Sequence, residues 1–103
     1  MTATYDGFWV SLVSSPLGTL TDDDLIALAN AVELQSELIA PVCGLLANRQ
    51  QFDIVAIIRR ESESVAIAAA KLAFIEAIQQ VVGRKVVPEI TLKSSEARTV
   101  GAP

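Results

Sequence analysis

The segment from Phe52 to Gly83 constrains the fold more than any other part of this sequence. It opens with an apolar run whose side chains alternate between two faces, as in a β-strand. A charged turn and a serine follow, and then a long run of alanine and larger apolar residues continues to Gly83. Glycine is common where helices end. The segment therefore predicts a strand at residues 52–60 followed by a long helix.

This predicted strand is apolar on both faces. One face carries Phe52, Ile54, Ala56 and Ile58, and the other carries Asp53, Val55, Ile57 and Arg59. A strand that is solvated on one side usually alternates cleanly between apolar and polar residues. We therefore expect the middle of both faces to be covered.

The helix that follows, capped by Ser62 or Ser64, is apolar over most of its circumference. The large apolar residues that cluster within about a third of the helical wheel are Ile67, Phe74, Ile75, Ile78, Val81 and Val82. A neighbouring stripe of small residues, where another helix could approach closely, is formed by Ala66, Ala70, Ala73 and Ala77. Val65 and Leu72 lie outside both groups. The narrow polar strip that remains predicts burial on more than one side.

The N-terminal part predicts a strand and a capped helix. Residues 1–6 are polar and expected to fray. Phe8–Val13 alternates like a strand and contains the single tryptophan, Trp9. After a turn, Thr21 and Asp24 have the spacing of a capping box, so a helix is expected from Asp22 to about Glu33. Its expected buried stripe is Leu25, Leu28, Ala29 and Val32.

Residues 38–46 allow two interpretations. Pro41 and Gly44 interrupt an apolar run, which suits an edge strand or a bulge better than a helix interior. On this interpretation residues 47–50 form a hairpin turn with Asn48 in the left-handed conformation. On the alternative, the first helix continues to Pro41 and breaks there, leaving three strands in place of four. We favour the strand.

The last predicted strand is Val86–Lys93, and residues 94–103 are expected to be a flexible tail after a single domain of residues 1–93. The predicted order is β-α-β-β-α-β. Two right-handed crossovers around a hairpin give the α+β, ferredoxin-like sandwich, with two helices on one face of a four-stranded antiparallel sheet.

Composition indicates a protein partner. Apolar residues make up 51% of the 103, more than a small monomer needs to fill its core. The net charge of −4 disfavours nucleic acid and anionic membranes, and Lys71 and Glu76 interrupt the longest apolar run. We therefore expect a homo-oligomer or another protein partner. The interface candidates are Trp9, Val55, Ile57, Arg59, Val65 and Leu72.

No catalytic, cofactor or metal site is predicted. The sequence has no histidine, which removes the commonest general base and the usual zinc sets. Consecutive residues on a helix diverge, so Asp22, Asp23 and Asp24 favour the helix N-terminus instead of holding a cation. Cys43, the single cysteine, has the setting of a buried small residue.

Without a signal sequence or a disulfide, the expected location is cytoplasmic, and the alanine- and valine-rich composition is typical of a high-GC genome such as that of an actinobacterium or its phages.

The predicted function is a small, non-enzymatic protein-interaction or self-associating domain. Two alternatives stay open. The loop Pro16–Leu20 resembles the corresponding loop of ACT domains, with Leu17 inserted between its proline and glycine, and that resemblance implies amino-acid sensing. A dimeric α+β barrel enzyme would instead need a cavity between sheet and helices. The polar groups available to such a cavity are Tyr5, Asp53, Arg59 and Cys43.

Overall fold

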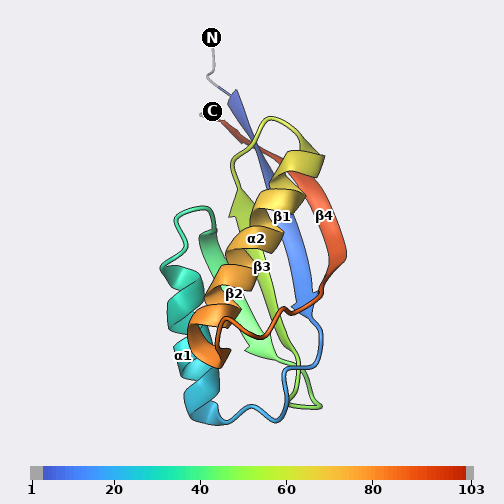
Figure 1. Cartoon of the computed structure of the whole chain (residues 1–103). Coiled ribbons are helices and arrows are strands. Elements are labelled where there is room, and N and C mark those ends of the chain that lie inside the picture. Colours follow the sequence, from blue (N-terminus) through green and yellow to red (C-terminus); the bar gives the residue numbers. More distant parts are fainter. Residues whose placement is uncertain (1–3, 102–103) are drawn as a thin grey trace.

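The computed structural model describes residues 4–101, with the backbone alone for residues 4–6 and 98–101. Two helices lie on one face of a four-stranded sheet (Figure 1). The elements in chain order are β1 (Thr4–Ser14), α1 (Asp22–Glu33), β2 (Ile39–Leu45), β3 (Phe52–Ile58), α2 (Glu63–Val82) and β4 (Ile90–Gly101). The sheet order is β2-β3-β1-β4 and each neighbouring pair is antiparallel. The predicted ferredoxin-like βαββαβ sandwich is therefore confirmed.

The two outer ends of the chain differ from the prediction. Residues 4–6, expected to fray, belong to β1, and residues 1–3 lie outside the described part. The last strand starts at Ile90 instead of Val86, because residues 86–89 form a loop tied to its surroundings by side chains. Gln79 Nε2 donates to the Val86 carbonyl at 2.9 Å, and the Glu89 N–H donates to Ser15 Oγ at 3.0 Å.

The expected flexible tail is wrong for residues 94–101, which continue β4 beside β1. A register shift between Ser11 and Leu12 of β1 leaves Lys93 of β4 without a register partner. This β-bulge changes which residues share a face, so the period-two pattern of β4 stops at Lys93. The strand itself continues, and residues 102 and 103 lie outside the described part.

The strand interpretation of residues 38–46 is confirmed, and the broken helix is wrong. The register of β2 against β3 shifts between Ile39 and Val42, so Pro41 lies in an irregular stretch of an edge strand. In the turn that follows, Arg49 and not Asn48 has the left-handed conformation, with φ at 56°. Asn48 Oδ1 instead accepts from the N–H groups of Gln50 and Gln51, at 2.9 and 3.3 Å.

Both helices begin at the predicted caps. The Asp24 N–H donates to Thr21 Oγ1 at 3.1 Å and the Thr21 N–H donates to Asp24 Oδ2 at 2.8 Å, so the capping box is complete. Ser62, and not Ser64, caps α2, and Gly83 ends it. In α1 the buried residues are Leu28, Ala31 and Val32, whereas Leu25 and Ala29 are half-buried. Ala31 therefore replaces Ala29 in the predicted stripe.

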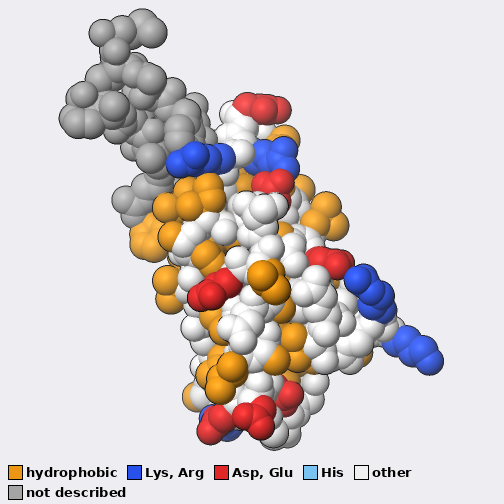
Figure 2. All heavy atoms as spheres, turned by 90° about the vertical axis from the view of Figure 1, so that its left-hand side faces the viewer, with side chains coloured by type: hydrophobic (Ala, Val, Ile, Leu, Met, Phe, Trp, Pro, Cys, Tyr) orange, Lys and Arg blue, Asp and Glu red, His pale blue; other side chains and the backbone are white. Residues whose placement is uncertain are grey.

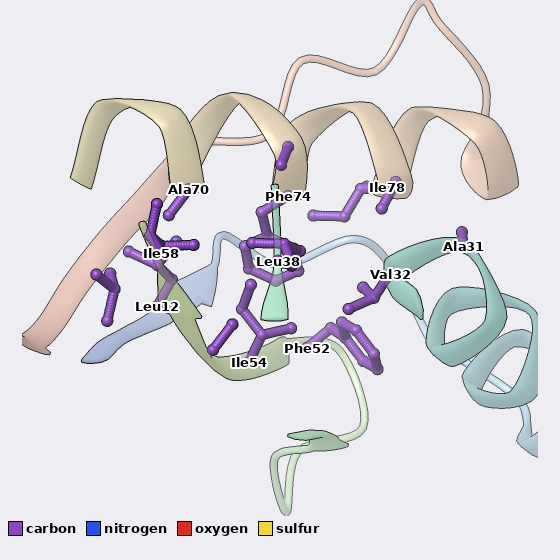
Figure 3. Close-up of a cluster of buried hydrophobic side chains, with 14 of the residues drawn as sticks. Leu12, Ala31, Val32, Leu38, Phe52, Ile54, Ile58, Ala70, Phe74 and Ile78 are labelled. Carbon is purple, nitrogen blue, oxygen red and sulfur yellow. The ribbon is translucent and has the colours of Figure 1, made fainter. Parts of the chain in front are cut away.

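The alanine stripe of α2 is part of the core and not a separate surface. The buried residues of this helix are Ala66, Ala70, Ala73, Phe74, Ala77 and Ile78. Figure 3 shows Ala70, Phe74 and Ile78 among the side chains of β1, β3 and α1. The larger residues Ile67, Ile75, Val81 and Val82 are only half-buried. The small side chains bring α2 close to the sheet, and Phe52 and Phe74 fill the centre with ring centroids 6.0 Å apart.

By length and composition α2 could also cross a membrane. The core helix of a soluble protein passes the same test, and the buried face of α2 accounts for much of its apolar character. We therefore treat α2 as the core helix of this sandwich.

Replacing Ala70 by Leu tests the close approach of α2. Ala70 is 1% exposed, so three extra carbon atoms at this position force neighbouring side chains apart. We expect Ala70→Leu to lower the free energy of unfolding by about 1–3 kcal/mol. The matched control is Ala68→Leu on the exposed side of the same helix, which should change it by about 0.5 kcal/mol or less. Urea denaturation measures both, and equal effects would contradict this packing.

Candidate interaction surface

The sheet face that points away from the two helices has no covering layer within residues 4–101 (Figure 1). The strand register places side chains from all four strands on it. Val55 of β3 is paired with Ser11 of β1 and with Val42 of β2, and Trp9 is paired with Ile57 and with Glu96 of β4. The next pair towards the other end is Val13 and Asp53. We call this surface the open face, formed by Trp9, Ser11, Val13, Ile39, Val42, Asp53, Val55, Ile57, Thr91, Lys93, Ser94 and Glu96.

The centre of the open face is apolar. Val42 is 70% exposed and Trp9 is 40% exposed, while Val55 and Ile57 between them are half-buried by their neighbours. These four side chains form a continuous apolar area across β2, β3 and β1. Exposed large apolar residues that adjoin one another mark contact surfaces more often than scattered ones do.

Charged residues border this apolar area at its two ends. At one end Lys93 Nζ reaches Asp53 Oδ2 at 3.8 Å, so the lysine chain extends from β4 over β1 to β3. At the other end Glu96 lies next to Trp9 in the register. An apolar centre with a polar rim is the usual anatomy of a protein–protein contact.

A hollow of about 200 Å³ lies on the open face, lined by Trp9, Ser11, Val55, Ser94 and Glu96. Pockets for drug-sized ligands and cofactors usually measure about 300–1,000 Å³. The hollow is therefore too small for a typical cofactor, and its size suits a single protruding side chain of a partner.

The structure divides the six predicted interface residues between two sides of the molecule. Trp9, Val55 and Ile57 come together on the open face. Val65 and Leu72, 41% and 69% exposed, belong to α2 in the helix layer. Arg59 is exposed and lies just beyond β3, which ends at Ile58 and not at Arg60 as predicted. The six residues therefore do not form one surface.

Val42 belongs to the open face and was not among the predicted residues. Its register with Val55 places it there, while the next residue, Cys43, pairs with Ile54 on the core side. The alternation from Val42 to Leu45 contains this information. Because the irregular stretch at Pro41 breaks the alternation, the pattern over residues 38–46 as a whole does not show which face Val42 lies on.

The helix layer has a second apolar spot around Leu72. A hollow of about 340 Å³ there is lined by Gln35, Glu37, Arg60, Ala69, Leu72, Ala73 and Glu76. An ion pair joins Arg60 to Glu37, and another joins Arg84 to Glu76 at 3.1 Å. Figure 2 shows hydrophobic side chains in several separate groups, with acidic and basic residues between them, on the side of the molecule that it presents. The charged residues Glu37, Arg60 and Glu76 therefore line the hollow beside Leu72.

Asp53, Arg59 and Cys43, the polar groups considered for an enzyme whose side chains the structure describes, are not brought together. Asp53 is on the open face and pairs with Lys93, whereas Cys43 packs against the core on the other side of the sheet. The Tyr5 side chain lies outside the described part. Phe52, Phe74, Leu12 and Leu28 fill the space between sheet and helices (Figure 3). Among the residues that the structure describes, no group of three or more His, Cys, Asp or Glu could hold a metal ion.

The loop at residues 16–20 is attached to the turn between β2 and β3. The Leu17 N–H donates to the Gln50 carbonyl at 2.7 Å and the Leu20 N–H donates to the Arg49 carbonyl at 2.8 Å. Arg49 also pairs with Asp22 at 2.7 Å. Two of the N–H groups that such a loop could offer to a ligand are thus used within the chain.

Comparison with known proteins shows a similarity at the level of structure. No protein-family model and no curated protein matches the sequence. Among solved structures, the chain is similar to a dimeric ferredoxin-like protein of unknown function from Thermobifida fusca YX, whose crystal structure has a resolution of 1.50 Å. The identity is 17%, the TM-score is 0.45, and the match covers 95% of this chain and 92% of that one.

The thiol of Cys43 provides a chemical test of its position on the core side. Burial raises the pKa of Cys43, and the nearby carboxylates of Glu33 and Asp53 raise it further. At pH 8 the folded chain should therefore react with iodoacetamide about tenfold more slowly than the chain unfolded in urea. Because the folded pKa exceeds the unfolded one, ionisation of this thiol should destabilise the fold as the pH rises through the folded pKa. Equal alkylation rates in the folded and unfolded chain would contradict this placement.

Proposed function

We propose that this protein is a non-enzymatic interaction domain that binds a protein partner through its open face. The observation that carries the proposal is the continuous apolar area of Trp9, Val42, Val55 and Ile57 on a sheet face without a covering layer in the described chain. The fold needs this face for no contact of its own, because the core lies on the other side of the sheet.

The energetics of burial support a protein contact at this face. Covering the exposed 40% of Trp9 would remove on the order of 80 Å² from water, which is worth about 2 kcal/mol at ~25 cal/mol per Å². Tryptophan is also among the residues that most often dominate binding energy. Val42, at 70% exposed, adds a second anchor on the neighbouring edge strand.

The geometry gives the two alternatives no specific support. For an enzyme, the described groups Asp53, Arg59 and Cys43 would have to converge, and they lie on different sides of the sheet or beyond its end. For an amino-acid sensor, the loop at residues 16–20 would need free N–H groups, and two of them already donate to the β2–β3 turn. A binding domain requires neither arrangement.

Site-specific photo-cross-linking in cells of the source organism tests this proposal. A photoreactive phenylalanine derivative would replace Val42 on the open face, or Ile26 on α1 as a control of similar exposure, 59% against 70%. We expect protein adducts from position 42 and about tenfold fewer from position 26, because only the first lies in a contact surface of this kind. Adducts with the same chain or with another protein would both support the proposal.

Two results of this experiment would contradict it. One is the absence of adducts from position 42 under conditions where the derivative is incorporated and the variant is folded. The other is an equal yield from positions 26 and 42, which would show that adduct formation follows exposure alone.

A further inference from the structure

We draw no further inference here: the strongest candidate, the apolar area of Trp9, Val42, Val55 and Ile57 at the centre of the open sheet face, carries nothing beyond the proposed function, because nothing in the structure shows what covers it.

Discussion

The close contact between the alanine face of α2 and the sheet is the interaction on which the rest of this structure depends. Ala66, Ala70, Ala73 and Ala77 are buried, and with Phe74 and Ile78 they bring the helix against β1 and β3. Helix α1 packs beside α2 and over β2, and its capping box fixes where it starts. Together they close the core on one side of the sheet, and no described element covers the other side.

This division gives the two apolar faces of β3 different surroundings. Phe52, Ile54, Ala56 and Ile58 are at most 1% exposed under the helices, whereas Val55 and Ile57 alternate with them towards the open face. In a sheet that water covers on one side, those positions would carry polar residues. Valine and isoleucine there, next to Trp9 and Val42, are the basis of the proposal that a partner supplies a third layer. The charged residues at the two ends of the face restrict which partner can supply it.

Local signals in the sequence predicted where most helices and strands lie. Bulges in the strands and the small side chains of α2 made the extent of β4 and the core face of α2 hard to predict. Thr21 and Asp24 predicted the start of α1, and the alternation in β3 predicted its two faces. The bulge at Lys93 interrupts the two-residue alternation of β4, so the residues after it were predicted to be a flexible tail instead of a strand. Burying an alanine side chain removes little apolar surface from water, so the sequence pattern assigned the core face of α2 to the larger apolar residues. The candidate surface was half predicted, because Leu72 and Val65 are as apolar as Val55 and only the fold separates the two groups.

Quenching of Trp9 fluorescence by acrylamide tests the central claim most directly, because the chain has a single tryptophan and it lies on the open face. For the purified, folded chain the account predicts quenching between that of a buried indole and that of free tryptophan, because 40% of Trp9 is exposed. Ala70→Leu, which perturbs the helix side, should not by itself expose the indole in the folded chain. Quenching as weak as that of a buried indole would contradict the claim that Trp9 lies on a sheet face without a covering layer in the described chain.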